Sequence, residues 1–410
     1  MSDIAGRPPG HSRGQPMPRD LEANPFSPGS PRPRRFVGRE SYIEDFEVSL
    51  AKWESDGTAP PTILLGVPGV GKSALLNRFA DIAQGRGWLV AQRQKVTART
   101  DLRRLFGQAF AEVEAQLIGG KTLNRRAQEL LSRFKEVRVQ GGFVGVTVGR
   151  ADAPRAGSLE QDLTAVLIEM AALTRSLPVL FVLDEIQFLP EDSLRAVIYA
   201  FDELANRVDP QTGDRMAVTL VAAGLPQAKA MCRKAGQYAE RFNYPWLEEL
   251  SREETIRAFR ETAQLADDDF TDEAAARGYQ LTGGYPQFIQ VYGELAWLRG
   301  LDSPISLRDM EGITPLARTR LEESFFSTRL TLATPEQQDL LMAMARLVVE
   351  SGAKAQTLTN IAHEMGRPPS SITYLFAPLV TKGLLYQPRP RGPYEMTVPK
   401  FADYLVGLEP

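Results

Sequence analysis

Cysteine and histidine are almost absent from this sequence of 410 residues. There is one cysteine, Cys232, and the two histidines, His11 and His363, lie far apart along the chain. A single cysteine excludes an internal disulfide framework. One cysteine and two histidines also offer too few ligands for a structural zinc site. They leave little material for a histidine-based catalytic triad, and we interpret His363 as a surface or packing residue.

Long apolar runs and a strong net charge are missing as well. The net charge is −3, with 43% hydrophobic and 24% charged residues, which is typical of globular proteins. No apolar run is long enough to span a bilayer, and the N-terminus lacks the apolar core of a signal peptide. No overall basic field points to nucleic acid, although a local basic patch is compatible with this composition. We expect a cytoplasmic protein of two or three domains.

The first 35 residues are rich in proline, glycine, serine and arginine. Such a segment cannot bury enough apolar surface to offset the entropy lost on ordering, so we predict a disordered arm over residues 1–35. Its arginines leave two alternatives, contact with a polyanion or a solvated tail, and we favour the solvated tail.

From residue 36 to about residue 232, short apolar runs alternate with segments of helical periodicity. This alternation, with nearly unbroken apolar strands, is typical of a parallel sheet covered by helices on both faces. Residues 137–149 alternate around two glycines and predict a hairpin insertion. The expected strands of the sheet cover residues 61–65, 87–92, 177–189 and 216–224.

After about residue 232 the strand patterns stop and helical periodicity continues. We predict a small helical domain over residues 233–310 and a linker helix over residues 311–333. Residues 334–410 read as three helices followed by two short strands around the turn "QPRPRGP" at residues 387–393. The chain is therefore expected to contain an α/β domain, a helical domain and a mixed C-terminal domain.

A glycine-rich loop follows the first expected strand. Residues 66–73, "GVPGVGKS", fit the pattern G-x-x-x-x-G-K-[ST] in full, between a strand and a helix. Glycines let backbone N–H groups surround phosphate oxygens, and the helix N-terminus adds its positive dipole end. In this chemistry Lys72 reaches the β- and γ-phosphates and the Ser73 hydroxyl binds Mg²⁺. We expect Lys72 to be partly exposed, so that its loss costs the fold little.

Two adjacent acids, Asp184 and Glu185, follow the apolar strand "VLFVLD". Packing alone does not explain two carboxylates at the edge of a buried strand. Asp184 is expected to hold Mg²⁺ through its water shell, and Glu185 to polarise the attacking water as a general base. The alternative, an acid pair that caps a helix, is weakened by the glycine loop in the same chain.

With these two motifs the sequence resembles the AAA+ class of P-loop ATPases, and within it the origin-recognition and STAND-like branch. "FVGRE" at residues 36–40 resembles the N-terminal box that lies against adenine in that branch, and "TGGYPQFIQ" at residues 282–290 resembles the Gly-x-Pro element of its lid. "AERFNYPWLEELSREE", at residues 239–254, is similar to the segment that leads into the lid, and it places Arg241 where an arginine often senses the γ-phosphate. The resemblance covers about residues 36–405.

The resemblance implies a parallel-sheet P-loop NTPase domain with a small helical lid and a C-terminal winged helix. It implies ATP and Mg²⁺ as cofactors, Ser73 and Asp184 as metal ligands, and Glu185 and Arg241 as catalytic residues. The residues assigned to nucleotide binding are Phe36, Val37, Gly38, Arg39, Gly66, Val67, Pro68, Gly69, Val70, Gly71, Lys72, Ser73, Ala74, Asp184, Gly284 and Pro286.

Two departures from the pattern bear on activity. The family usually carries a polar sensor at the end of the strand after the Asp-Glu pair, whereas this strand ends in "VAAG", with Thr219 and Gln227 as weak substitutes. The lid element has no arginine for a second sensor. These departures favour weak or partner-dependent hydrolysis, and Arg241 has the alternative of a surface ion pair.

The C-terminal residues resemble a winged helix. A third helix entering a major groove would turn Ser370, Ser371, Thr373 and Tyr374 toward base edges. The cations expected at phosphates are Lys382, Arg389 and Arg391. However, residues 335–410 carry seven Lys and Arg and seven Asp and Glu, whereas a strong DNA-binding domain is usually basic. Protein contact or autoinhibition stays open as the alternative.

Three functions follow as hypotheses. The first is a slowly hydrolysing ATP-dependent switch that reorients the winged helix, with homo-oligomerisation on ATP binding as a further expectation. The second is a double-stranded DNA-binding module that ATP licenses. The third is a STAND-type signalling or defence ATPase with protein partners, which the lack of appended repeats weakens. Kinase activity is disfavoured because the chain continues into a lid and a winged helix.

Overall fold

The computed structural model describes residues 23–56, 60–118, 158–174, 177–208, 213, 215–301, 303–389 and 391–408. The hairpin predicted at residues 137–149 lies outside them. The chain packs into two compact units. We call residues 30–32, 39–249 and 322–410 the sheet unit, and residues 23–29, 33–38 and 250–321 the helical unit.

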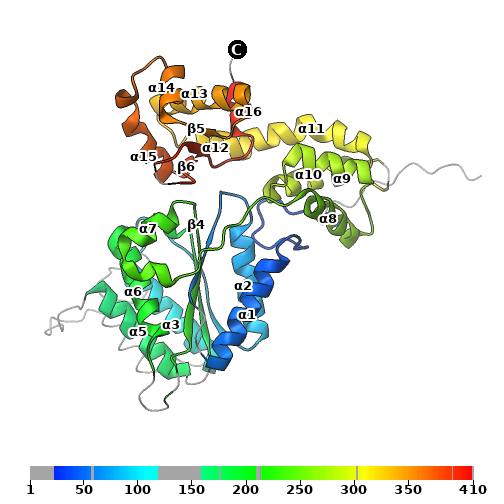
Figure 1. The fold of residues 1–410 in the computed structure, drawn as a ribbon. Helices are drawn as coiled ribbons and strands as arrows, with labels where there is room; N and C mark the ends of the chain where they lie inside the picture. Colours follow the sequence, from blue (N-terminus) through cyan, green and yellow to red (C-terminus); the bar gives the residue numbers. More distant parts are fainter. Residues whose placement is uncertain are drawn as a thin grey trace, which may run out of the picture. The chain divides into compact units, whose positions relative to one another are not determined.

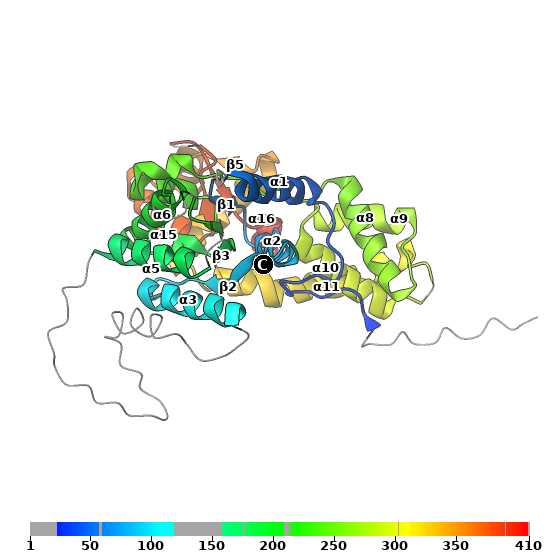
Figure 2. The ribbon, with the colours of Figure 1, turned by 90° about the horizontal axis from the view of Figure 1, so that it is seen from below.

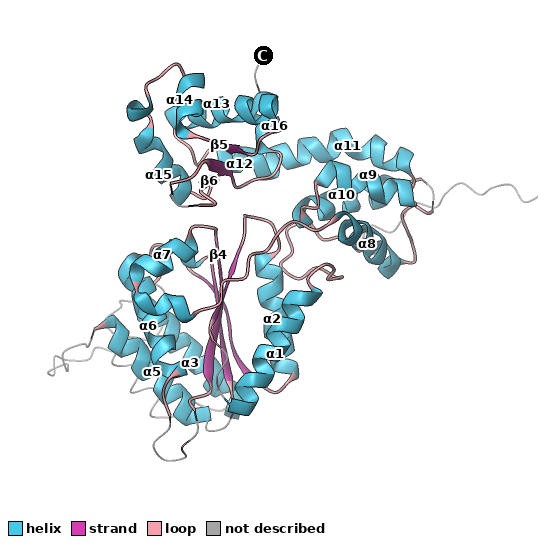
Figure 3. Cartoon of the chain, in the orientation of Figure 1, coloured by secondary structure: helices cyan, strands magenta, loops and turns pink. Residues whose placement is uncertain are grey.

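The sheet unit is built on a parallel sheet, shown edge-on in Figure 3. Among the described residues the sheet has four strands, in the order β1-β4-β3-β2. The two central strands, β3 and β4, are buried along their whole length, as their unbroken apolar sequences predict. The expected strands are all present, as β1 Thr62–Leu65, β2 Leu89–Lys95, β3 Val179–Asp184 and β4 Val218–Gly224.

Helices cover both faces of this sheet, which confirms the predicted α/β class. Helices α1 and α2 lie on one side, and α3, α5, α6 and α7 lie on the other, as the two views in Figures 1 and 2 agree. The rings of Phe106, Phe181 and Phe201 meet at centroid distances of 5.1 to 6.1 Å in the core on the second side. The helices are α1 Glu40–Asp56, α2 Lys72–Gly85, α3 Leu102–Ile118, α5 Leu159–Thr174, α6 Glu191–Ala205 and α7 Ala228–Ala235.

Residues 243–247 form an extra edge beside β1 that the sequence patterns do not reveal. The amide of Ile63 donates to Asn243 O, and the amide of Leu65 donates to Pro245 O, each at 2.8 Å. The amide of Leu247 donates back to Leu65 O at 2.7 Å. This pairing keeps the chain with the sheet as far as residue 249, beyond the boundary expected at residue 232.

The helical unit consists of packed helices around a core of aromatic and aliphatic side chains. Its expected helices are present, and a further one, α11, runs up to the end of the unit at Leu321. The linker helix predicted over residues 311–333 is interrupted after Leu321 by a π-helical turn at Glu322–Phe326. The helices are α8 Arg252–Ala263, α9 Asp272–Thr282, α10 Pro286–Arg299 and α11 Leu307–Leu321.

The N-terminal residues of the helical unit are ordered from residue 23. Phe26 is 3% exposed and lies 6.1 Å, ring to ring, from Phe270. Its ring occupies the space that a side chain at Gly293 would need, 2.3 Å from that position's Cβ. The prediction of a disordered arm is therefore wrong for residues 23–35, because one buried aromatic ring anchors a segment whose composition is otherwise polar.

The C-terminal region, residues 322–410, belongs to the sheet unit. Its small antiparallel sheet has the strand order β5-β7-β6. The sequence predicts two strands here, and the structure adds a third, β5, which pairs antiparallel with β7. In the part of the chain that the structure describes, none of the helices has the length and hydropathy of a membrane-spanning segment. The elements are α12 Ser327–Leu330, α13 Pro335–Ser351, β5 Ala355–Gln356, α14 Leu358–Glu364, α15 Thr373–Thr381, β6 Leu385–Tyr386, β7 Tyr394–Met396 and α16 Phe401–Val406.

Candidate functional site

The glycine loop connects β1 to α2 with a backbone that side chains would obstruct. Gly69 and Gly71 have φ values of 81° and 101°, in the left-handed region that favours glycine. At Gly66 a Cβ would lie 2.8 Å from Val70 Cγ1 and 3.1 Å from the carbonyl of Leu247. Gly71 caps the N-terminus of α2 without a side-chain hydrogen bond. The first N–H groups of this helix thus point into the loop as donors for an anion.

Lys72 is buried inside this loop. Its Nζ donates to the carbonyls of Gly66 at 2.8 Å and Val67 at 2.9 Å, and the residue is 7% exposed. The expectation of a partly exposed lysine is wrong, because the loop folds its own carbonyls around the ammonium group. Burial lowers the pKa of Lys72 to about 8, although Glu185 and Asp184 oppose this shift.

Ser73 and Asp184 meet at the end of β3. The Ser73 hydroxyl donates to Asp184 Oδ2 at 2.7 Å, and Asp184 is 3% exposed. The two oxygens come from residues 111 positions apart in the sequence. A hydroxyl and a carboxylate at this spacing match the hard oxygen ligands that Mg²⁺ prefers, so the residues present fit such an ion.

Glu185 follows directly in a left-handed backbone conformation. Its φ is 64°, which is uncommon for a residue other than glycine. Its amide donates to Asp184 Oδ1 at 2.9 Å. Such a conformation costs about 1–3 kcal/mol, and residues that adopt it cluster at functional sites. The two successive carboxylates have different side-chain partners, Ser73 for Asp184 and Gln187 for Glu185.

Gln187 is a site residue that our sequence analysis did not identify. It lies in the short 3₁₀ turn Ile186–Phe188, is 6% exposed, and its Nε2 donates to Glu185 Oε2 at 2.5 Å. Its Oε1 accepts from the amide of Leu225 at 3.0 Å. A polar residue two positions after the acid pair was the only sequence signal, and no motif points to it.

The N-terminal box reaches the loop through Arg39. The Nη2 of this buried guanidinium donates to Val70 O at 3.1 Å and to Glu248 O at 2.6 Å. Arg39 thereby joins the glycine loop to the segment beside β1. The other residues of the box, Phe36 to Gly38, belong to the helical unit, and their nucleotide contact stays a prediction.

The Gly-x-Pro element lies in the helical unit and has a local structural reason for its residues. Gly284 has a φ of 78°, and a Cβ there would lie 2.0 Å from the carbonyl of Leu250. Pro286 occupies the first position of α10, where its missing N–H has no intrahelical partner to lose. Their predicted contact with nucleotide is a separate question and stays a prediction.

Arg241 lies at the end of the 3₁₀ turn Gln237–Arg241 that follows α7. Its guanidinium pairs with Asp202 on α6 at 2.9 Å and lies over the ring of Tyr238 at 5.5 Å. The side chain of Arg241 is 60% exposed, whereas that of Asp202 is 9% exposed. The ion-pair alternative therefore has a named partner, and the role at a γ-phosphate stays a prediction.

The strand after the acid pair, β4, ends without a polar side chain near the loop. It ends at Gly224, and Leu225 follows with 5% exposure. Thr219 lies within the strand, paired with Leu180 rather than at its end. The side-chain Nε2 of Gln227 donates to the carbonyl of Val380 in the C-terminal region at 2.9 Å.

Some of the residues predicted to contact DNA are hydrogen-bonded within the protein, whereas others are exposed on a turn. Lys382 Nζ donates to Gln337 Oε1 at 2.6 Å, and the hydroxyls of Ser371 and Thr373 donate to carbonyls of the preceding turn. Arg389 and Arg391 are exposed, on a turn closed by a 2.9 Å bond from the Gly392 amide to Arg389 O. The structure thus leaves two cations of the predicted set on one exposed turn.

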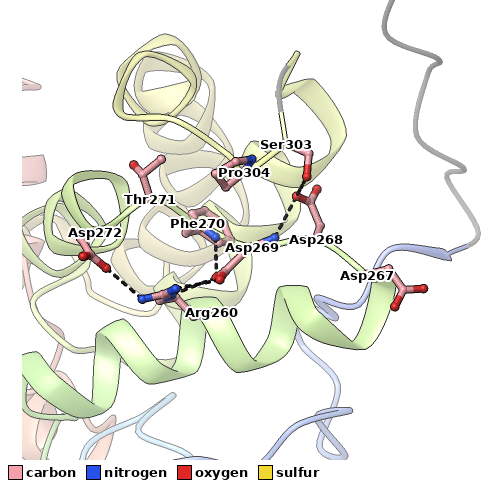
Figure 4. Close-up of a pocket in the computed structure, with 9 residues that line it drawn as sticks. All are labelled: Arg260, Asp267, Asp268, Asp269, Phe270, Thr271, Asp272, Ser303 and Pro304. Carbon is pink, nitrogen blue, oxygen red and sulfur yellow. Dashed lines mark hydrogen bonds and ion pairs between the residues drawn. The ribbon is translucent and has the colours of Figure 1, made fainter.

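A separate pocket in the helical unit carries acidic side chains, drawn in Figure 4. Arg260 pairs with Asp269 at 2.8 Å and with Asp272 at 2.9 Å, and the Ser303 hydroxyl donates to Asp268. In Figure 4 Asp267 points away from these pairs. The ion pairs connect the end of α8 to the start of α9, so this pocket is explained by helix packing.

Two different protein-family models match the N-terminal and the C-terminal parts of the sheet unit. Residues 35–211 match the AAA ATPase domain. Residues 323–405 match a domain of unknown function, which coincides with most of the C-terminal region. No curated protein is similar enough in sequence to match this chain.

Solved structures share the fold over nearly the whole chain. A Walker-type ATPase of Pyrococcus abyssi has a TM-score of 0.53 at 16% identity, covering 92% of this chain and 97% of its own. The ORC2 protein of Aeropyrum pernix, solved in ADPNP and ADP complexes, has a TM-score of 0.57 at 13% identity, covering 96% and 97%. At these identities the similarity establishes the fold.

Proposed function

We propose that this chain, which belongs to the AAA+ class of P-loop ATPases, is a cytoplasmic switch that binds ATP with Mg²⁺, hydrolyses it slowly and uses its nucleotide state to reposition the C-terminal region. The single observation that carries the proposal is the convergence of Lys72 and Ser73, at the start of α2, with Asp184 and Glu185, at the end of β3. Their residue types and their order match the requirements of phosphoryl transfer to water.

The loop supports the binding of a polyphosphate. The N–H groups at the start of α2 would donate to phosphate oxygens, and the ammonium of Lys72 would exchange its contacts with Gly66 O and Val67 O for contacts with those oxygens. Charge-assisted hydrogen bonds to phosphate are stronger than bonds to neutral carbonyls, which favours this exchange. Ser73 and Asp184 would hold Mg²⁺, which neutralises charge on the phosphates.

The acid after Asp184 supports hydrolysis rather than binding alone. Glu185 is half-buried at the strand end, where its carboxylate would accept a proton from the attacking water. Slow turnover is expected because β4 ends at Gly224 and is followed by Leu225, and neither residue has a polar side chain to offer to the phosphates. Arg241 is our candidate for a γ-phosphate contact, supplied within the chain or from a neighbouring subunit in an oligomer.

The C-terminal region has the element order that a winged helix requires, α13-β5-α14-α15-β6-β7. Duplex DNA is its candidate partner, because Arg389 and Arg391 are exposed on the turn between β6 and β7. A protein partner of a STAND-type ATPase is the second candidate. It is favoured by the balanced charge of residues 335–410 and by Lys382, which is already bonded to Gln337.

The decisive experiment for ATP binding replaces Lys72 by alanine. Binding of a fluorescent ATP analogue and ATP turnover are measured on the full chain, with Arg78→Ala as control, because Arg78 is exposed on the same helix. We expect Lys72→Ala to lose binding or turnover and Arg78→Ala to keep both. Circular dichroism checks the fold, since removing two hydrogen bonds costs about 1 kcal/mol each. Equal binding and turnover in Lys72→Ala and wild type would overturn the proposal.

Fluorescence anisotropy with labelled duplex, titrated with salt in the presence and absence of ATP, separates the two partners. Binding that weakens steeply with salt and depends on ATP supports DNA. Binding to DNA that is weak and indifferent to ATP supports the protein partner.

A further inference from the structure

The ends of β3 and β4 are joined by one buried amide group. Gln187 Nε2 donates to Glu185 Oε2 at 2.5 Å, and Gln187 Oε1 accepts from the amide of Leu225 at 3.0 Å. The first contact engages a carboxylate oxygen of the proposed general base. The second anchors the same amide to the backbone directly after β4. A movement at Leu225 is therefore transmitted to Glu185 through a single side chain.

The close approach of this amide depends on a glycine. A Cβ at Gly224 would lie 3.2 Å from Gln187 Oε1, 3.0 Å from Ile186 Cγ1 and 2.7 Å from Ala228 Cβ. Three neighbours therefore occupy the space beside Gly224, and Gln187 is 6% exposed within it. The amide has little freedom to turn while the backbone of residues 224–228 stays in place.

That backbone is in turn covered by the C-terminal region, within the same compact unit. Leu225 Cδ1 lies 2.4 Å from the position that a Cβ at Gly383 would take, so the glycine sits directly on the leucine side chain. Gln227 Nε2 donates to Val380 O at 2.9 Å. Residues 225–227 thus carry the contact of Val380 and Gly383 on one side and the anchor of Gln187 on the other.

The contact with Val380 is incompletely satisfied. Gln227 Oε1 is buried and finds no hydrogen-bond donor among the described residues. A buried acceptor without a donor carries a desolvation cost that is recovered when the contact opens. Opening the contact between Gln227 and Val380 therefore costs less free energy than opening a contact in which every buried polar atom is hydrogen-bonded.

We propose that Gln187 is a positioning residue that holds Glu185 away from the attacking water, and that release of Val380 and Gly383 from residues 225–227 frees it. The inference rests on the proposed ATPase function. A purely structural glutamine would need only the bond to Leu225, whereas the bond to Glu185 occupies an oxygen that a general base requires. Detachment of the C-terminal region is thereby coupled to hydrolysis.

Turnover of full-length variants tests the coupling. Gln187→Met keeps the side-chain length and removes both hydrogen bonds, and Gln227→Met removes the bond to Val380. Gln237→Met is the matched control, because Gln237 is exposed. We expect Gln187→Met to raise kcat roughly 10-fold with KM unchanged, the effect of losing one hydrogen bond to a charged group. Gln227→Met should raise kcat less, and the double variant should not exceed Gln187→Met.

Hydrogen exchange without nucleotide gives a readout that does not depend on activity. In Gln187→Met the amide of Leu225 loses its acceptor and should exchange faster, while in Gln227→Met the peptide covering residues 380–386 should exchange faster. If Gln187→Met fails to fold, Gln187→Glu keeps the acceptor for Leu225 and repels Glu185, and it should also raise kcat.

An unchanged or lower kcat in Gln187→Met, or fully additive effects in the double variant, would overturn the inference. Such a result leaves the proposed function intact if wild type binds ATP and Lys72→Ala does not. If the wild-type protein does not bind ATP, the proposed function is refuted instead. The exchange rate of the Leu225 amide would then still report whether Gln187 anchors that amide.

Discussion

The glycine loop and the C-terminal region both carry residues predicted to bind anionic ligands, but the fold treats them differently. At the loop, the ammonium of Lys72 is buried among the loop carbonyls, and the half-buried Ser73 donates to the buried Asp184 at the end of β3. In the C-terminal region, Lys382 is bonded to its own domain, while Arg389 and Arg391 stand exposed on a turn.

This difference separates two kinds of sequence signal. The loop motif specifies a backbone shape, and a backbone shape brings its side chains to defined positions. Lysines and arginines near a predicted wing specify only charge, and any neighbouring polar group can form a hydrogen bond with the charged side chain. Mutations should therefore act strongly and specifically at the loop, and weakly and additively at the C-terminal turn.

The largest effect is expected at Glu185. Glu185→Gln removes the proton acceptor but keeps the shape of the side chain, so turnover should fall by about 10²–10⁴-fold. ATP binding, measured by calorimetry, should stay near that of wild type. A variant that lost binding and kept turnover would show that the roles of Glu185 and the loop are assigned wrongly.

Asp184 should give the next largest effect, on the metal rather than on chemistry. Asp184→Asn removes the charge that would hold Mg²⁺ through its water shell, and such changes typically cost about 10–100-fold in metal affinity. The Mg²⁺ concentration for half-maximal turnover should rise accordingly, and Asp45→Asn, at an exposed acid of α1, should leave it unchanged. An identical Mg²⁺ dependence in both variants would contradict the assignment.

A substitution at Arg241 tests whether a residue outside the two motifs affects turnover as specifically as the loop residues do. We expect Arg241→Ala to lower turnover about 10-fold with little change in ATP affinity, within the range of lost charge-assisted hydrogen bonds. Asp202→Asn is the control, because it removes the partner and leaves the arginine.

If both variants lose stability and turnover equally, Arg241 acts only as an ion pair. Turnover recovered on mixing Arg241→Ala with Lys72→Ala protein would indicate that the arginine acts on a neighbouring subunit.

The smallest effect is expected at the turn between β6 and β7. Arg389→Ala combined with Arg391→Asn removes two charges, and asparagine tolerates the φ of 59° at position 391. If the region binds duplex DNA, the slope of log K against log salt should flatten by up to roughly two units, at about 0.9 per phosphate contact. Lys354→Ala, at an exposed lysine, serves as control. An unchanged slope in the double variant would leave this turn without a DNA role.

The α/β fold and its strands were predictable because unbroken apolar runs and a glycine loop have few other solutions. Segment 243–247 was not, because a five-residue segment with a proline and polar residues forms its bonds to β1 through the backbone alone. The ordering of residues 23–29 depends on the pocket that Phe26 fills between helices far away in the sequence.

Within the site, the residues of the two motifs were predictable and their surroundings were not. The burial of Lys72 depends on the carbonyls of Gly66 and Val67, which no side-chain pattern records. Gln187 could not be singled out because its importance comes from Leu225, 38 residues away, and from the missing side chain at Gly224. Tertiary neighbours, rather than local spacing, decide such contacts.

The backbone pairing beside β1 has a mechanical consequence. The chain that leaves the sheet unit at residue 249 is bonded through Ile63, Leu65 and Leu247 to the strand that enters the glycine loop. A pull along residues 247–250 would load these hydrogen bonds in shear, where evenly spaced bonds of a parallel pair share the force. Arg39 adds a further tie from Glu248 to the loop carbonyl of Val70. Tension in this connection would therefore be felt at Gly66 and Val70 before any bond in the centre of the sheet is strained.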